Sequence, residues 1–255
     1  MALVALCVCS QVLADDTKAM HEIDIALAHG HSLPLANKIS FIIPTDNVEG
    51  MLNALAKWPE ISVTVVGENK LKVVMSQQPK YRGEPDFAHT QSSFVIDYEE
   101  DAVQAFINDF ETGDRDASFL NRIEGYVADY ITEPTYVHGF NIASLTAQNK
   151  SGDCTEYSVL VAALARAKGL PARVVLGSVI TEFDGVVGAY GHAWTEVWLE
   201  DEWHIVDAAL HDSSAPKTFY FPQGAITRED PGFGFAMVSQ ALLMPRRIEA
   251  LRNLE

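Results

Sequence analysis

The chain has 255 residues, of which 48% are hydrophobic and 21% are charged, and its formal net charge is −17. This length and composition suit one large or two small globular domains and exclude an intrinsically disordered chain. The negative charge argues against binding of nucleic acid or of an anionic membrane surface, because both need a basic face.

The first fourteen residues, MALVALCVCSQVLA, carry no charge and are mostly apolar. They end in a small-residue cleavage site, so residues 1–14 are predicted to be a signal peptide, although the usual basic start is missing. Export would place the protein in the periplasm or outside the cell and would remove Cys7 and Cys9. The alternatives are lipid attachment at one of these cysteines or an apolar N-terminus of a cytosolic protein. No apolar run is long enough to span a membrane.

Residues 15–91 are predicted to form a small N-terminal α/β region of unknown role. Its strands are expected at residues 39–43, 61–67 and 70–75, with a helix at 47–58 between the first two. His29 and His31 could touch a metal ion, but no further ligand follows at a suitable spacing, and a solvated terminus is the expected state. A polar stretch around Pro79 marks a candidate boundary.

Residues 92–255 are predicted to form a second domain. Helical spacing of apolar residues is seen first and strand patterns follow, which favours an α+β fold. Residues 211–233 look loop-rich, and Pro245 interrupts a predicted final helix. The predicted helices are 101–110, 117–131, 143–148, 154–168 and 236–253, and the predicted strands are 173–180, 192–199 and 203–207.

Cys154 is expected in the first turn of a helix, because Asp153 and Glu156 form a capping box with Asp in place of Ser or Thr. A helix N-terminus stabilises a thiolate, and its free N–H groups can hold the oxyanion that forms during acyl transfer. If residues 1–14 are removed, Cys154 has no cysteine left to pair with. The alternative is a packed and inert cysteine.

His192 opens one predicted strand, and Asp207 ends the next one after the turn at residues 200–202. An antiparallel hairpin brings the start of its first strand beside the end of its second, so these two side chains are expected at the same end. Cysteine, histidine and aspartate in this order suggest a nucleophile, its base and the carboxylate that orients the base.

Three stretches carry a resemblance to a known family: Gly152–Tyr157 with Ala162–Arg173, His192–Val197, and Trp203 followed by Asp207. Together they closely resemble the bacterial transglutaminase-like superfamily over about residues 92–209. The resemblance implies a papain-like fold with a Cys-bearing central helix packed on an antiparallel sheet. It also implies Cys154 as nucleophile, His192 as base and Asp207 as orienting carboxylate.

The sequence departs from the family pattern after Asp207, where Ala208 stands in place of an expected proline or threonine. The side chain that would complete the oxyanion hole is not evident, and Tyr136, Asn141 and Gln148 are weak candidates. Trp194 and Trp203 could line a substrate channel or pack in the core. The chain has no paired CxxC motifs, which disfavours a zinc-bearing branch of the family. No cofactor and no metal site is predicted.

The predicted function is a thiol-dependent hydrolase of the cysteine protease or amidase type, acting on a peptide or protein substrate. A protein-glutamine γ-glutamyltransferase, which cross-links proteins, is the alternative that shares the same chemistry, because an amine replaces water as the acceptor. A non-catalytic binding module that kept the fold is the third possibility. The sequence leaves the substrate, any calcium requirement and the oligomeric state open.

Overall fold

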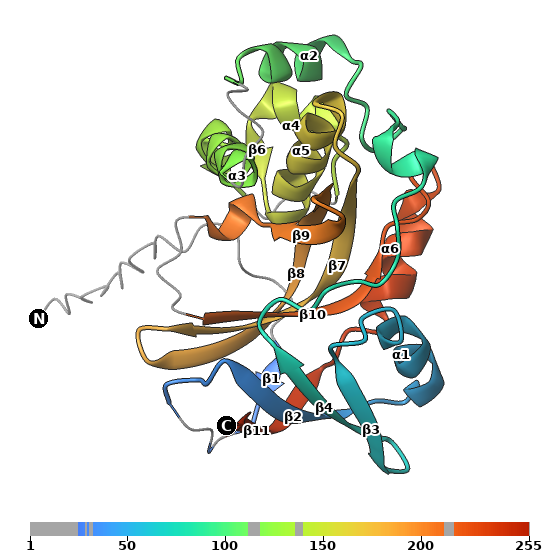
Figure 1. The fold of residues 1–255 in the computed structure, drawn as a ribbon, viewed down its shortest axis with the longest axis vertical. Coiled ribbons are helices and arrows are strands. Elements are labelled where there is room, and N and C mark those ends of the chain that lie inside the picture. Colours follow the sequence, from blue (N-terminus) through green and yellow to red (C-terminus); the bar gives the residue numbers. More distant parts are fainter. Residues whose placement is uncertain are drawn as a thin grey trace, which may run out of the picture.

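A computed structural model describes residues 25–28, 30, 33–111, 118–135, 140–211 and 217–254. The described part of the chain is arranged in three layers (Figure 1): helices, a central antiparallel sheet, and a second sheet. Two hydrophobic cores separate these layers, one on each face of the central sheet. The predicted signal peptide, with Cys7 and Cys9, lies outside the described residues, as do His29 and His31.

The helices are α1 (Val48–Leu55), α2 (Asp101–Asn108), α3 (Phe119–Tyr130), α4 (Ala143–Asn149), α5 (Cys154–Ala167) and α6 (Phe233–Ala241), with short 3₁₀ turns η1 (Phe87–Thr90) and η2 (Ala208–Leu210). The strands are β1 (Ala26–Leu27), β2 (Lys38–Pro44), β3 (Ser62–Gly67), β4 (Lys70–Ser76), β5 (Glu133–Pro134), β6 (Ser151–Gly152), β7 (Ala172–Phe183), β8 (Val186–Leu199), β9 (Glu202–Val206), β10 (Lys217–Ala225) and β11 (Arg247–Leu254).

The central sheet has the strand order β10-β7-β8-β9, and all of its pairs are antiparallel. Alternate residues of β7 enter different cores, since Val174 packs against the helices and Val175 against the second sheet. A strand that is covered on both faces has apolar residues at consecutive positions, as Val174–Leu176 and Val179–Ile180 do here. The central sheet is therefore the element that connects the two halves of the molecule.

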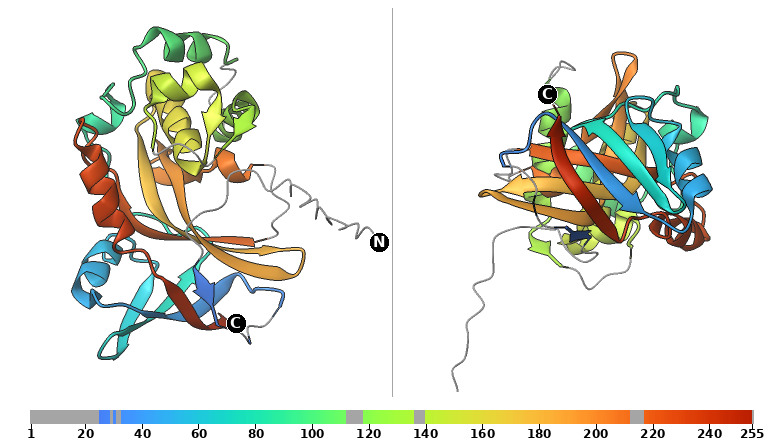
Figure 2. Two further views of the ribbon diagram at one scale, coloured as in Figure 1. Left: turned by 180° about the vertical axis from the view of Figure 1, so that it is seen from behind. Right: turned by 90° about the horizontal axis from the view of Figure 1, so that it is seen from below.

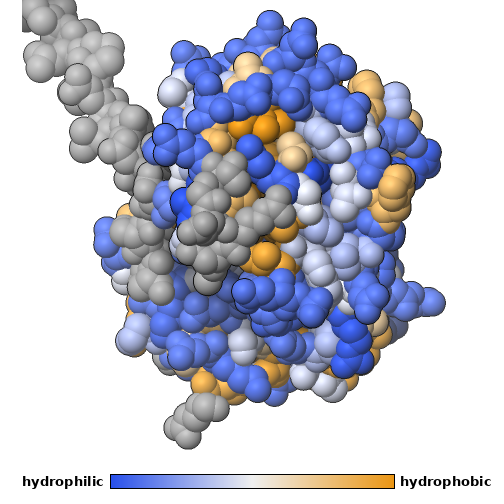
Figure 3. All heavy atoms as spheres, turned by 45° about the horizontal axis from the view of Figure 1, so that its top comes forward, coloured by the Kyte–Doolittle hydropathy of each residue, from blue (hydrophilic) through white to orange (hydrophobic). Residues whose placement is uncertain are grey.

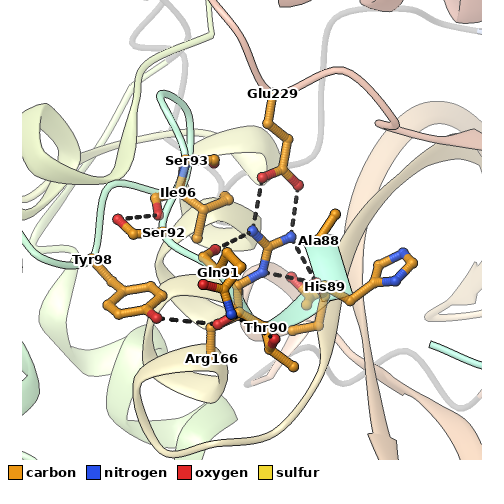
Figure 4. Close-up of polar contacts among 12 residues, drawn as sticks. Ala88, His89, Thr90, Gln91, Ser92, Ser93, Ile96, Tyr98, Arg166 and Glu229 are labelled. Atoms are coloured by element: carbon orange, nitrogen blue, oxygen red, sulfur yellow. Dashed lines mark hydrogen bonds and ion pairs between the residues drawn. The ribbon is translucent and has the colours of Figure 1, made fainter. Parts of the chain in front are cut away.

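The helical layer is organised around α5, which is buried along nearly its whole length. Thr195 on β8 donates a hydrogen bond to the carbonyl of Ser158 on α5 at 2.7 Å, which fixes the helix to the central sheet. Near the end of α5, the Arg166 guanidinium donates to both carboxylate oxygens of Glu229 at 2.7 Å and to the carbonyl of Gln91 (Figure 4). Three separate segments of the chain are thereby held together at one buried cation.

The second sheet has the strand order β1-β11-β2-β4-β3. It contains the predicted N-terminal strands, and it also contains β11 from the C-terminal end of the chain, which lies beside β2 (Figure 2, right). The predicted division at residue 91 therefore differs from the division into sheets, because residues 247–254 share a sheet with residues 38–76.

Two further elements differ from the sequence prediction. The predicted final helix over residues 236–253 is wrong in its second half: α6 ends at Ala241 and the chain continues as β11. Ile248 and Leu251 are buried in the second core, so tertiary packing outweighs local helical preference there. Residues 217–225, within the stretch interpreted as loop-rich, form the edge strand β10.

Hydrophilic residues cover most of the face seen in Figure 3, and hydrophobic residues gather in small areas between them. Within the described ranges, no helix is long and apolar enough to cross a membrane.

Candidate active site

Cys154 is the first residue of α5, at the position that the sequence predicts, and its thiol is free and partly buried. The capping box is complete. The Asp153 carboxylate accepts a hydrogen bond from the backbone N–H of Thr155 at 2.9 Å, and the Glu156 carboxylate accepts one from the N–H of Asp153 at 2.9 Å. These bonds set the point at which the helix begins and so fix the backbone that carries the thiol.

Glu156 also connects the start of α5 to the segment before α4, because its carboxylate accepts a hydrogen bond from the backbone N–H of Asn141 at 2.7 Å. The side chain is fully buried, and this burial raises the pKa of Glu156 to about 7. A Cβ atom on Gly152 would lie 2.2 Å from that of Glu156, so only glycine fits at the position before the cap. The local sequence Gly-Asp-Cys-Thr-Glu is thus matched to this helix start.

His192 lies on β8, directly opposite Gly177 on β7. The ring of Trp194 stacks beside the imidazole, with 6.4 Å between the ring centroids. A Cβ atom on Gly177 would come within 2.5 Å of both the Trp194 ring and the Phe221 carbonyl oxygen. The missing side chain at Gly177 therefore makes room for the indole that packs against His192.

Asp207 follows β9 directly, and its Oδ2 atom lies 2.8 Å from Nε2 of His192. Both side chains are buried, with exposed fractions of 1% for His192 and 5% for Asp207. The β8–β9 register, in which Thr195 pairs with Val206, brings these two residues to the same end of the hairpin. The structure thus brings together the histidine and the aspartate that the hairpin argument predicts.

The pKa of His192 reflects opposing effects. Burial of the imidazole lowers it, whereas the charge and hydrogen bond of Asp207, followed by the Cys154 side chain, raise it to about 10. Within the described residues, the other ring nitrogen, Nδ1, is buried without a hydrogen bond of good geometry. Helix α5 packs against β8, and the Cys154 side chain is one of the groups that raise the pKa of His192.

A free thiol, an imidazole and a buried carboxylate are therefore gathered between the start of α5 and the end of the β8–β9 hairpin. In this arrangement, Nε2 of His192 is occupied by Asp207, which leaves Nδ1 to exchange a proton with a sulfur nucleophile or a leaving group. Among the residues described, His, Cys, Asp and Glu form no cluster of three or more that could hold a metal ion.

The other sequence candidates have different positions. Trp194 and Trp203 are 1% and 3% exposed, which is core packing rather than the wall of an open channel. Tyr136 lies outside the described residues. Asn141 contacts Glu156 through its backbone, and Gln148 is exposed on α4, so neither side chain is assigned to an oxyanion hole.

Two polar contacts to Asp207 were not predicted. The Tyr220 hydroxyl donates to Oδ2 of Asp207 at 2.9 Å. The backbone N–H of Asp207 donates to the Glu124 carboxylate at 3.3 Å. The β-branched and aromatic residues of Thr218–Phe221 are a strand signal that could have located Tyr220 on β10. No local signal reports its contact with Asp207, because β7 and β8 lie between β10 and β9 in the sheet.

A cavity of about 1050 Å³ lies elsewhere, between α1, η1, the end of β10 and α6. Trp58, Tyr81, His89 and Arg173 are among its lining residues, which do not include Cys154 or its two partners. The cavity is thus distinct from the place where the reactive groups meet.

Comparison with known families gives one match, in which residues 104–208 fit the model of the transglutaminase-like superfamily. This segment contains the cysteine, the histidine and the aspartate described above. No curated protein matches the sequence.

Several solved structures are similar to this one, among them the following two. A candidate cysteine protease from Cytophaga hutchinsonii has 14% sequence identity and a TM-score of 0.43, and the match covers 74% of this chain and 76% of that protein. The periplasmic domain of TgpA from Pseudomonas aeruginosa has 19% identity and a TM-score of 0.40, with 56% of each chain covered.

Proposed function

We propose that this chain, in which residues 104–208 match the transglutaminase-like superfamily, is a thiol-dependent hydrolase of peptide or carboxamide bonds. In this proposal, Cys154 is the nucleophile, His192 is the general base and acid, and Asp207 orients the imidazole. The single observation that carries it is the buried 2.8 Å contact between His192 and Asp207 beside a free cysteine at a helix start.

The proposed reaction begins when the Cys154 thiol gives its proton to His192 and the sulfur attacks the carbonyl carbon of the substrate. The tetrahedral intermediate collapses, the amine leaves with the proton from His192, and an acyl thioester remains on Cys154. Water then gives a proton to His192 and attacks the thioester. Release of the carboxylic acid returns the proton to the sulfur.

The start of α5 supports the intermediate in this proposal. In the first turn of α5, the backbone N–H groups of Thr155 and Glu156 donate to the Asp153 carboxylate, whereas that of Cys154 has no acceptor within the helix. The Cys154 N–H can therefore donate to the oxyanion, and the capping box holds it in place. Asp207 stabilises the imidazolium that forms twice in the cycle.

The test compares the protein with its Cys154→Ala variant on a mixture of peptides and carboxamides, with products identified by mass spectrometry. We expect cleavage by the wild type alone, and a trapped acyl-enzyme whose added mass lies on Cys154. A second arm adds a labelled primary amine and a glutamine-bearing protein. Incorporation of the amine in preference to hydrolysis would make the protein a cross-linking enzyme instead. Equal product formation by both proteins would show that Cys154 is not the nucleophile.

We also propose a periplasmic or secreted location, which rests on the uncharged apolar composition of residues 1–14. Mass spectrometry of the protein from its native host tests this. A mature chain that starts near Asp15 supports export, whereas a cytosolic protein that retains Cys7 and Cys9 contradicts it. The roles proposed for Cys154, His192 and Asp207 do not depend on the outcome.

A further inference from the structure

The Asp207 carboxylate has two hydrogen-bond donors on one oxygen atom. Oδ2 lies 2.8 Å from Nε2 of His192 and 2.9 Å from the hydroxyl of Tyr220. A carboxylate rotates about its terminal bond when it is held by a single donor, and a second donor on the same atom restricts which oxygen faces the imidazole. The contact with Tyr220 therefore bears on the orientation of Asp207 toward His192.

Tyr220 is itself held from several sides. The residue is 6% exposed, and its ring meets the Trp194 ring edge-on, with 5.2 Å between the centroids. Its backbone N–H donates to the carbonyl of Gln77 at 2.9 Å, in the segment that follows β4. Trp194 in turn stacks on His192, so the phenol and the imidazole are set against the same indole.

The phenol remains a donor over the whole working range of pH, since burial, followed by the charge of Asp207, raises the pKa of Tyr220 well above 10. Glu124 and Leu210 also contact Asp207, but both do so through its backbone: Glu124 accepts from the Asp207 N–H, and the Leu210 N–H donates to the Asp207 carbonyl. Among the contacts described, Tyr220 is thus the group besides His192 that acts on the carboxylate itself.

We propose that Tyr220 is a positioning residue of this site: its hydroxyl holds Oδ2 of Asp207 toward Nε2 of His192, and so orients the imidazole for proton exchange with Cys154. This inference rests on the proposed function. Tyr220 acts only through Asp207 and touches no substrate, so its removal is expected to slow turnover without weakening substrate binding.

The experiment compares Tyr220→Phe with Tyr130→Phe. The second variant is matched, because the Tyr130 hydroxyl also donates one intramolecular hydrogen bond, to the Ala147 carbonyl at 2.8 Å, but on α3 and α4. We expect Tyr220→Phe to lower kcat about tenfold, as the loss of one hydrogen bond of about 1.4 kcal/mol predicts, with KM within about twofold of wild type. Tyr130→Phe should leave both values unchanged.

Proton NMR gives a readout that does not need a substrate. The resonance of the His192 Nε2–H, identified by its absence in His192→Ala, should move in Tyr220→Phe and stay in place in Tyr130→Phe, because one of two donors to the same oxygen has been removed. An unmoved resonance overturns the inference. Equal kcat values for Tyr220→Phe and Tyr130→Phe also overturn the inference, when the wild type hydrolyses its substrate through Cys154.

Failure of the proposed function gives a different result from failure of the Tyr220 inference. In that case the wild type forms no acyl-enzyme on Cys154, while the NMR comparison still reports whether Tyr220 orients the Asp207–His192 pair.

Discussion

His192 is the residue with the most distinct environment in the candidate site. Its imidazole is almost completely buried, yet its pKa is raised to about 10, because Asp207 and Cys154 outweigh the effect of burial. A buried cation is tolerated only beside a compensating charge. The histidine and the aspartate are therefore coupled, and changing either one alters the other.

We predict that Asp207→Asn lowers kcat by about 10⁴-fold, the effect of the same change in a serine-based triad. His192→Ala should cost more, because it removes the group that transfers the proton, whereas Asp207→Asn leaves the imidazole in place. Steady-state kinetics of both variants on the substrate found for the wild type measure the difference. Activity of Asp207→Asn close to that of wild type would remove Asp207 from the proposed mechanism.

We predict that Gly177→Ala destabilises the protein by about 1–3 kcal/mol, as overpacking does in a filled core. The added Cβ would lie 2.5 Å from the Phe221 carbonyl oxygen and from the Trp194 ring, and neither the strand backbone nor a buried indole can move away freely. Urea denaturation measures the change. Gly234→Ala on α6 is the control, since its Cβ would meet nothing within 4 Å. Equal stability of the two variants would contradict the close packing at Gly177.

At the scale of single elements, the start of α5 depends on a carboxylate that is costly to ionise. Glu156 is buried and its pKa is raised from 4.5 to about 7, whereas in the unfolded chain it ionises at the ordinary value. The folded state therefore binds more protons than the unfolded state between these two values. The stabilisation is complete below pH 4.5 and is lost as the pH rises through about 7.

We predict that Glu156→Gln removes this part of the pH dependence. The free energy of unfolding of the wild type should fall, relative to that of the variant, by on the order of a few kcal/mol between about pH 4.5 and pH 8. Urea titrations of both proteins at several pH values provide the comparison. Parallel curves for the two proteins would show that Glu156 ionises in the folded state as it does in the unfolded chain.

The end of α5 depends on a buried ion pair instead. The Arg166 side chain is fully buried and Glu229 is 14% exposed, whereas the nearby pair of Arg228 and Asp230 is largely exposed. We predict that Glu229→Ala costs about 3–5 kcal/mol, because it leaves an uncompensated buried guanidinium. Arg228→Ala should cost less than about 1 kcal/mol. Thermal unfolding of both variants decides this, and a mild effect of Glu229→Ala would mean that water reaches Arg166.

At the scale of the whole molecule, the two cores share one sheet, since β7 contributes side chains to both. The second sheet also contains both the N-terminal strands and β11. We propose that residues 92–255 carry the chemistry, whereas the described residues before 92, together with β11, cover the opposite face of the central sheet. In this arrangement neither part has a complete hydrophobic core without the other.

We predict a single unfolding transition that includes both sheets. Leu251→Ala on β11 should lower the free energy of unfolding by about 2–5 kcal/mol, because it empties a buried site in the second core. Far-UV circular dichroism and tryptophan fluorescence should give coinciding midpoints for the wild type. They should coincide again, at a lower denaturant concentration, for Leu251→Ala. Arg252→Ala, with an exposed side chain on the same strand, is the control. Two separate transitions, of which only one moves, would indicate independent domains.

The features that depend on local order could be predicted from the amino-acid sequence. The capping residues around Cys154 predict where α5 begins, and alternation on either side of a short turn predicts the hairpin that brings His192 to Asp207. Both follow from hydrogen bonds and side-chain periods within a few residues of the chain.

Features that depend on contacts between distant segments could not be predicted in this way. Residues 247–254 form a strand rather than a helix because the edge of β2 and a buried core accept them there. Tyr220 reaches Asp207 because the fold places β10 and the end of β9 within reach of one another, although two strands separate them in the sheet. Such contacts arise from the packing of whole layers, which no local pattern of residues specifies.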